Sequence, residues 1–378
     1  MRALVVASRF PWPSTTGDRL RASEWVAALG GTFDVTLVSP VGDASLVPAA
    51  IRHVGAPVSS LRAAGAAFRT LARGLPLHDA LGGRVGWDSA FRSLRGERFD
   101  IVVCLLTRTL PWIDARALAP RLVVDAVDAL SRSMDERARG ARGPLRAFWA
   151  REARLTSVRE TLAASDADAV VVVGEAEREP FGGRAIVIPV GVEIRPPGDS
   201  ERDLDCAFWG RLGFFANRDA AELLLREIWP SIREALPAAR LVIAGADAPA
   251  SIRAANGRDG VEIESPMNDR VRLLRRARVA VMPVRFGTGQ SVKLLEACEA
   301  GLAVAAFPAA LRGVAFPDGA AEVRTTPDDL ARAVIAMLRD RDATARMAHA
   351  GRDWVMREFD REKTRAMMRE LAVRVVAG

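Results

Sequence analysis

The amino-acid sequence predicts an α/β protein made of two Rossmann-like, doubly wound domains. Short apolar runs bounded by turn residues alternate with longer segments of helical periodicity along the chain. This alternation is typical of a parallel sheet that helices cover on both faces. The alternation stops near residues 193–204, where apolar residues become rare and two prolines appear, and then starts again. With 378 residues, the chain is long enough for two domains with a core each.

The first half of the chain contains a series of apolar runs of strand length. In order, they are Leu4–Ala7, Val35–Ser39, Ile101–Leu105, Leu122–Asp125, Ala169–Val173 and Ile186–Pro189. Helical periodicity between them predicts helices at residues 18–30, 60–74, 86–96 and 131–165. We therefore expect a first domain at residues 1–194 and a linker at 195–203.

The second half repeats the pattern. Its apolar runs are Ala207–Gly210, Arg240–Ala244, Val261–Glu264, Val279–Pro283 and Ala303–Ala306, and helices follow from Pro327 to Val376. We expect a second domain at residues 204–355, and a C-terminal helix at 356–378 that packs back on the first domain.

Residues 279–304, VAVMPVRFGTGQSVKLLEACEAGLAV, form the most informative segment. A buried strand is followed by a glycine-containing loop and then by a helix that ends near Gly301. A glycine loop before a helix N-terminus can bind phosphate, because free N–H groups and the helix dipole both favour an anion. Lys293 and Glu296 lie three residues apart on that helix, so both can face one ligand.

Lysine is rare in this chain. Lys293 and Lys363 are its two lysines among 54 cationic residues. Because arginine is the default cation here, a lysine in the glycine-loop helix suggests that a compact ammonium is required at that point. The alternative is an ordinary solvated lysine with a glutamate one turn away.

At this point the segment resembles the donor-binding motif of the retaining glycosyltransferases of GT-B fold, family 4 in particular. Glu296-Ala-Cys-Glu-Ala-Gly301-Leu-Ala-Val304 matches the second half of that motif, whereas Thr288 stands where the family has its first glutamate. The resemblance implies two domains that face a cleft, with the first domain, 1–194, on the acceptor side and the second, 204–355, binding a nucleotide-sugar donor. It also implies that Glu296 binds the ribose hydroxyls of that donor. It also implies that Thr288, Gly289, Gln290 and Ser291 lie at the donor.

A second matching element opens the second domain. Gly210-Arg211-Leu212 resembles the family's G-R-L sequence, and Ala216 and Asn217 stand where many members have a lysine. The resemblance implies that Arg211 and Lys293 are the catalytic residues, which stabilise the departing diphosphate. A guanidinium fork and an ammonium suit that role because each binds phosphate oxygens with charge assistance.

The remaining candidate residues follow from the same resemblance. In donor binding, it adds Gly210 and Asn217, and also Met267, which lies in the loop that usually holds the base. In the first domain, it places Gly17 and Asp18 beside the donor diphosphate. Asp125 and Asp128, at the end of the strand 122–125, are candidates for contact with the acceptor or the donor sugar, although Asp128 suits an N-cap equally well.

Composition excludes several classes of protein. The net charge of +7 comes without a polybasic tail or a nucleic-acid-binding motif, so we expect no nucleic-acid partner. The three cysteines and three histidines lack metal-ligand spacing, so we expect neither a metal requirement nor a cofactor. No apolar stretch approaches membrane-spanning length, which predicts a cytoplasmic protein. Arg132–Arg159, with Phe148 and Trp149, is either a peripheral contact with the inner face of the membrane or a surface helix packed on its own sheet.

The resemblance implies transfer of a sugar from a nucleotide-diphosphate sugar to an acceptor hydroxyl, with retention of configuration, in cell-surface polysaccharide or glycoconjugate synthesis. Lipid-linked, saccharide and small-molecule acceptors all remain open, and glycosylation of a small-molecule natural product is one alternative. Another is a related GT-B enzyme, such as an epimerase or an inverting transferase. The family departures at Val127, Ala216 and Thr288 keep a non-catalytic GT-B-like binding or assembly subunit open as well.

Overall fold

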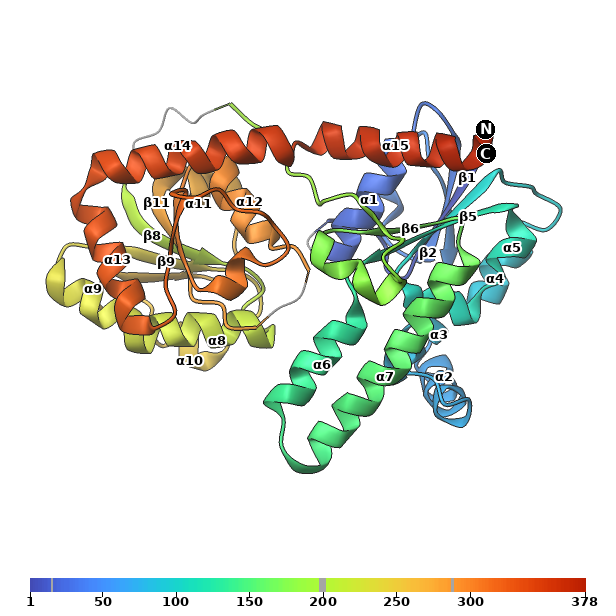
Figure 1. Cartoon of the computed structure of the whole chain (residues 1–378), viewed down its shortest axis with the longest axis horizontal. Coiled ribbons are helices and arrows are strands. Elements are labelled where there is room, and N and C mark those ends of the chain that lie inside the picture. Colours follow the sequence, from blue (N-terminus) through green and yellow to red (C-terminus); the bar gives the residue numbers. More distant parts are fainter. Residues whose placement is uncertain (15, 197–201, 287–288) are drawn as a thin grey trace. The chain divides into compact units, whose positions relative to one another are not determined.

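The structure is a computed structural model that describes residues 1–14, 16–196, 202–286 and 289–378 (Figure 1). The chain forms two compact units. Unit 1 comprises Met1–Val190 together with Glu362–Gly378, and unit 2 comprises Gly191–Arg361. Each unit contains one parallel β-sheet, which gives the α/β, two-domain fold that the sequence predicts.

The sheet of unit 1 has the strand order β3-β2-β1-β4-β5-β6-β7. The strands are β1 (Arg2–Ala7), β2 (Asp34–Pro40), β3 (Arg52–Ala56), β4 (Ile101–Leu105), β5 (Arg121–Val127), β6 (Ala169–Val172) and β7 (Ile186–Val187). The central strands are buried on both faces, so they appear in the sequence as continuous apolar runs. The edge strand β3 was not predicted, because its sequence RHVGA is only partly buried and has no such run.

Helices cover both faces of this sheet. On one face, α1 (Gly17–Leu29) and α15 (Arg361–Ala377) bury Trp25 and Met368 in a common core. Arg365 of α15 pairs with Glu24 of α1 at 2.7 Å, and Arg369 donates to the carbonyl of Ala28. On the other face, α4 (Trp87–Arg92) and α5 (Ala115–Leu118) pack on the strands. The C-terminal helix thus begins at Arg361. From Glu362 onward it belongs to unit 1, whereas residues 356–361 belong to unit 2.

The expected helix at residues 131–165 is two helices, α6 (Leu130–Gly140) and α7 (Gly143–Asp166). Ala141 and Arg142 are extended, and Gly143 has a positive φ of 57°. Pro144 lies in the first turn of α7, where it needs no N–H partner but prevents the helix from continuing through it. The prediction of a single helix was wrong because it relied on helical periodicity, which does not register the break at Gly143 and Pro144.

Unit 2 contains a sheet of order β10-β9-β8-β11-β12-β13. Its strands are β8 (Leu204–Trp209), β9 (Leu241–Ala244), β10 (Val261–Glu264), β11 (Ala277–Met282), β12 (Ala303–Ala306) and β13 (Ala321–Val323). One face carries α8 (Phe215–Leu223), α9 (Trp229–Ala235), α10 (Ala250–Arg253) and α13 (Pro327–Arg339). The other carries α11 (Arg270–Arg276), α12 (Val292–Glu299) and α14 (Arg341–Glu358). The short edge strand β13 was not predicted.

The remaining helices and turns complete the two units. They are α2 (Ser60–Ala72) and α3 (Ala80–Gly83), the 3-10 turns η1 (Ala44–Leu46), η2 (Leu77–Asp79), η3 (Thr107–Trp112), η4 (Glu175–Glu177), η5 (Glu179–Phe181) and η7 (Pro308–Leu311), and the π-helical turn η6 (Leu224–Ile228). None of the helices described is long and apolar enough to cross a membrane.

The expected linker at 195–203 lies partly outside the described residues, which omit 197–201. Its described ends belong with unit 2. The backbone N–H of Arg195 donates to Glu299 at 2.9 Å, and Arg202 donates to the carbonyl of Ala300 at 2.7 Å. The division between the compact units falls at Val190 and Gly191, a few residues before the expected boundary at 194.

Candidate active site

The site in unit 2 lies at the carboxyl ends of β8 and β11, which are neighbours in the sheet. From β8 the chain continues to β9 and β10 on one side, and from β11 to β12 and β13 on the other. The loops that leave β8 and β11 therefore separate at this point. In open parallel sheets, ligands bind at such a switch point, beyond the carboxyl ends of the strands.

Gly210, the first residue after β8, approaches its neighbours too closely for a side chain. It has a φ of 140°, and a Cβ there would lie 3.0 Å from Asn217 Nδ2 and 3.2 Å from Lys293 Nζ. Gly245, with a φ of 154°, packs even more closely against the backbone of Gly210. A Cβ added at Gly245 would lie 1.7 Å from the carbonyl oxygen of Gly210. The positive φ angles favour glycine at both positions, and at Gly245 a side chain would also collide with backbone atoms. Gly210 thus lets the amide of Asn217 and the ammonium of Lys293 lie against the backbone.

Lys293 projects from the first turn of α12. Its Nζ donates to Asn217 Oδ1 at 2.6 Å, and Asn217 Nδ2 donates in turn to the carbonyl of Arg211 at 3.0 Å. Burial lowers the pKa of Lys293 to about 8, although the nearby charge of Glu296 opposes that shift. An ammonium has three N–H donors, and Asn217 accepts from one of them. The arrangement holds a poorly solvated cation whose charged form a phosphate would stabilise.

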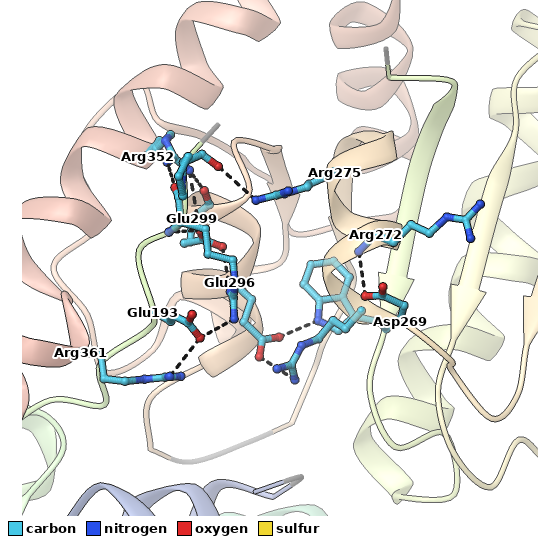
Figure 2. Close-up of polar contacts among 12 residues, drawn as sticks. Glu193, Asp269, Arg272, Arg275, Glu296, Glu299, Arg352 and Arg361 are labelled. Carbon is cyan, nitrogen blue, oxygen red and sulfur yellow. Dashed lines mark hydrogen bonds and ion pairs between the residues drawn. The ribbon is translucent and has the colours of Figure 1, made fainter. Parts of the chain in front are cut away.

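Glu296, one turn further along α12, is held by two donors (Figure 2). Trp209 Nε1, at the end of β8, donates to Glu296 Oε2 at 2.9 Å. Arg270 Nη1 of α11 pairs with Oε1, also at 2.9 Å. The Glu296 side chain is 14% exposed and that of Arg270 is 47% exposed. The buried indole fixes the orientation of the carboxylate, while the more exposed arginine can be exchanged for a ligand hydroxyl.

The loop before α12 includes the four positions that the resemblance places at the donor. Thr288 lies outside the described residues. Gly289 has a φ of 72°, and Gln290 and Ser291 are half-buried. Ser291 is the N-cap residue of α12, but its side chain makes no capping hydrogen bond. The first turn of α12 therefore lacks a side-chain cap, and a helix N-terminus of this kind favours an anion.

Arg211 lies at the rim of this site. Its side chain is 66% exposed, and its Nε donates to Asp247 Oδ2 at 2.7 Å. Asp247 follows β9 and has a positive φ of 59°. The sequence analysis missed Asp247, although its place just after Gly245 at a strand end was a usable signal. This pair uses only the Nε–H of Arg211, and its exposure makes it easy to exchange for a ligand.

Further residues lie around this rim. One of them, Met267, was predicted to bind the donor, and the others form an ion pair and an aromatic group. Met267 is half-buried and packs against the core of unit 2. Arg285 pairs with Asp219 at 2.9 Å, and this carboxylate raises the pKa of Arg285. Exposed aromatic rings follow nearby, with Phe215 between Phe214 and Phe286 at centroid distances of 4.8 and 6.1 Å. The sequence analysis did not identify the ion pair or the aromatic group.

In unit 1, Gly17 and Asp18 form the first turn of α1. Asp18 accepts a hydrogen bond from Thr16 Oγ1 at 2.7 Å and pairs with Arg9 at 3.3 Å and Arg108 at 3.5 Å. These arginines come from the loops that follow β1 and β4. Asp18 thus gathers cationic side chains at the carboxyl edge of this sheet. The ligand roles of Gly17 and Asp18 stay predictions.

Asp125 has a structural role that the sequence did not reveal. It is fully buried, and its Oδ2 accepts from Arg21 Nε at 2.7 Å and from Trp25 Nε1 at 2.5 Å. Its Oδ1 accepts from the backbone N–H of Val127 at 2.9 Å. With these donors around it, the carboxylate ties β5 to α1 and is closed to an acceptor or a sugar.

Asp128 is half-buried and does not cap the following helix. The N-cap residue of α6 is Ala129, which makes no side-chain capping bond. The N-cap interpretation of Asp128 was therefore wrong. Its charge instead acts on Arg108. Burial lowers the pKa of Arg108, and the carboxylates of Asp18 and Asp128 oppose that shift.

A buried polar cluster in unit 1 escaped the sequence analysis. Asp79, which is fully buried, lies 3.3 Å from His78 Nε2 and 3.4 Å from Arg159 Nε. Burial raises the pKa of Asp79 to about 7 and lowers the pKa of His78 to about 4. Among the described residues, no group of three or more His, Cys, Asp or Glu side chains could hold a metal ion.

Comparison with known proteins agrees with this geometry. Residues 203–340, within unit 2, match the family model described as glycosyl transferases group 1. Sucrose-phosphate synthase from Thermosynechococcus elongatus superimposes with a TM-score of 0.72 at 15% identity, covering 100% of both chains. The fold is GT-B. No curated protein matches the chain in sequence.

Other GT-B structures give the same result. WaaG, a glycosyltransferase involved in lipopolysaccharide biosynthesis, has a TM-score of 0.69 at 17% identity and covers 97% of this chain and 99% of its own. HepE from Anabaena, in complex with UDP-glucose, has a TM-score of 0.67 at 14% identity and covers 99% of this chain and 100% of its own. Identities this low compare folds only. Together with the family match in unit 2, the GT-B fold supports a glycosyltransferase.

Proposed function

We propose that the protein is a retaining, family 4-like glycosyltransferase that moves a sugar from a nucleoside-diphosphate sugar to an acceptor hydroxyl. The observation that carries this proposal is the position of Lys293. Its ammonium lies against Asn217 and Gly210 at the switch point of the GT-B domain that matches the family model. Desolvation has lowered its pKa to about 8, and a bound diphosphate would stabilise the charged form.

The donor binds in unit 2 with its parts assigned to different groups. The diphosphate lies between Lys293 and the uncapped first turn of α12, where a cation and backbone N–H groups both favour it. Arg211 adds a second cation once it leaves Asp247. Glu296, oriented by Trp209, accepts hydrogen bonds from the ribose hydroxyls in place of Arg270.

In the reaction, the bond between the anomeric carbon and the diphosphate oxygen breaks, and the acceptor oxygen bonds to the anomeric carbon on the same face. Because the acceptor oxygen attacks the anomeric carbon directly, no protein nucleophile is required. A phosphate oxygen takes the acceptor proton, so no protein base is required either. Lys293 and Arg211 offset the negative charge that develops on the leaving diphosphate, the kind of electrostatic stabilisation that lowers such barriers most. Neither a metal ion nor a cofactor has a role in this scheme.

We place the activity in cell-surface polysaccharide or glycoconjugate synthesis, in the cytoplasm, with a lipid-linked or saccharide acceptor. WaaG, which acts in lipopolysaccharide biosynthesis, and HepE, solved with UDP-glucose, support this choice through their shared fold. A small-molecule acceptor is the alternative. A non-catalytic GT-B subunit is the alternative of another class, and the departures at Val127 and Ala216 favour it.

The test has two stages. A thermal-shift panel of UDP, GDP and dTDP identifies the base, and the matching nucleotide sugars are then incubated with candidate acceptors. The proposal expects stabilisation by one nucleotide and release of free nucleotide in proportion to the glycoside formed. Stabilisation without turnover of any donor would identify a binding subunit, and no response to any nucleotide would remove the donor site.

A further inference from the structure

Helix α2 exposes its large apolar side chains to solvent. Leu61 is 84% exposed, Phe68 is 73% exposed and Leu71 is 55% exposed. Val58, just before the N-cap residue Ser59, is 50% exposed. Single exposed apolar residues are ordinary, but several on one helix form a patch that favours an interaction.

α2 buries small side chains and exposes large apolar ones, which is the reverse of what an ordinary surface helix does. Its buried residues are Ala66 and Thr70, which are small. Helix periodicity places Leu61 and Phe68 on the opposite face, seven residues apart in one row. Figure 1 shows α2 beside α3 and away from the strands of the sheet in unit 1. The large apolar row therefore does not serve the core of unit 1, which a surface helix normally covers with such residues.

Charge on α2 is of one sign. Arg62, Arg69 and Arg73 follow each other at intervals of seven and four residues, along the flank between the exposed and the buried face. Arg69 also lies over the ring of Trp112, at 5.3 Å from its centroid. Residues 44–78 contain no aspartate or glutamate. The surface thus combines an apolar row with a cationic flank.

We propose that α2 docks unit 1 on an anionic lipid membrane, with Leu61, Phe68 and Leu71 at the level of the headgroups. A helix with an apolar face and arginines beside it lies in the plane of a membrane interface and binds anionic lipid. A second copy of this chain is a poorer occupant, because an antiparallel two-fold contact through α2 would bring the two arginine flanks together, and no acidic residue of α2 would face them in either orientation. The proposal does not depend on the proposed function, although it would bring the enzyme to a lipid-linked acceptor.

The segment that the sequence analysis considered for such a contact, Arg132–Arg159, is organised differently. Phe148 and Trp149 are half-buried and contact each other at a centroid distance of 5.0 Å. Arg137 of α6 lies over the ring of Trp149 at 4.9 Å. The aromatic residues that would anchor this segment are thus engaged within the α6–α7 hairpin. Exposed apolar residues do remain on α7, at Leu145, Val158 and Leu162, and they provide a matched control.

The experiment uses the full chain and sedimented vesicles of phosphatidylcholine alone or mixed with phosphatidylglycerol. The parent protein should bind the mixed vesicles and not the neutral ones. A triple variant, Leu61→Gln with Phe68→Gln and Leu71→Gln, should lose at least about tenfold in partitioning, because three anchors are removed. Arg62→Gln with Arg73→Gln should weaken binding and reduce its dependence on salt. The α7 control, Leu145→Gln with Val158→Gln and Leu162→Gln, should bind as the parent does.

Several outcomes would overturn the proposal. One is a parent protein that stays in the supernatant with both kinds of vesicle, and another is loss of binding by the α7 control. Gel filtration with light scattering tests the second copy, since a dimer that the α2 triple variant dissociates would assign this face to self-association. Every substituted side chain of the α2 and α7 triple variants is exposed, so unchanged thermal unfolding of these variants is the check on folding.

Discussion

Units 1 and 2 each hold a carboxylate with the same two kinds of partner, yet they use it differently. Asp125 accepts from the indole of Trp25 and pairs with Arg21, while Glu296 accepts from the indole of Trp209 and pairs with an arginine of α11. We call the first group the closed triad, Arg21–Asp125–Trp25. The second is the open triad, Arg270–Glu296–Trp209.

The difference between the triads lies in the exposure of the arginine. In the closed triad, the Arg21 side chain is 1% exposed and also donates to the carbonyls of Ile188 and Pro189. In the open triad, the side chain of Arg270 is 47% exposed. A buried guanidinium cannot leave its carboxylate, whereas a half-exposed one can be replaced by a ligand at little cost. Partner identity alone therefore does not distinguish a structural carboxylate from a binding one.

The largest expected effect is on the stability of the closed triad. Asp125→Asn leaves the charge of Arg21 buried without its counter-ion, and we expect the free energy of unfolding to fall by roughly 3–5 kcal/mol. The matched change Glu296→Gln in the open triad should cost about 1 kcal/mol or less, because its arginine can turn to solvent. Denaturant unfolding of both variants makes the comparison. Equal losses would show that the two triads do not differ as described.

The next effect is on diphosphate binding in unit 2. Lys293→Ala removes a charge-assisted contact worth about 1.5–3 kcal/mol, so nucleoside-diphosphate affinity should fall by about ten- to a hundredfold. Lys363→Ala, at the other lysine and exposed on α15, is the control and should bind as the parent does. Arg211→Ala should have a smaller effect, since its side chain begins in an exposed ion pair. If Lys293→Ala retains full affinity, the diphosphate lies elsewhere.

The affinity for diphosphate should also depend on pH. Because the pKa of Lys293 is about 8 in the free protein, this side chain is charged at pH 7 and mostly neutral well above pH 8. The phosphates are already ionised in this range, since their second pKa is about 6. We therefore expect affinity to fall by about tenfold as pH rises from about 7 to about 9.5, and Lys293→Ala to flatten this profile. A slope that persists in the variant would assign the titration to another group.

The smallest effect concerns the arginine of the open triad. Arg270→Ala removes a competitor for Glu296, and an exposed ion pair is worth about 0.2–1 kcal/mol. Affinity for the nucleoside diphosphate should therefore rise by up to about fivefold, while affinity for pyrophosphate stays the same. Calorimetry with both ligands measures this. A decrease for the nucleotide would mean that Arg270 itself contacts the donor.

The sequence predicted the buried parts of the fold better than its edges. Central strands such as β4 appear as continuous apolar runs because helices cover both of their faces. Of the four edge strands, β7 and β10 were predicted, whereas β3 and β13 were missed because they are partly exposed and contain no apolar run. The break between α6 and α7 depends on Gly143 and Pro144, a local feature that periodicity averages out.

For the site, the sequence identified residues that lie within a motif and missed those that other elements supply. Lys293 and Glu296 lie on one helix with a recognisable spacing. Trp209, Arg270 and Asp247 come from separate strands and loops, and only the fold brings them to the site. The structural role of Asp125 was missed for the same reason, because its position at a strand end does not reveal that distant helix residues enclose it.

The central claim is that the open triad and Lys293 form a nucleoside-diphosphate site. Calorimetric titration of the parent and of Glu296→Ala with pyrophosphate and with UDP, GDP and dTDP tests it most directly. We expect the parent to bind one nucleoside diphosphate more tightly than pyrophosphate, and Glu296→Ala to lose this difference while its affinity for pyrophosphate is unchanged. Equal losses for both ligands, or a parent that prefers no nucleotide to pyrophosphate, would contradict the claim.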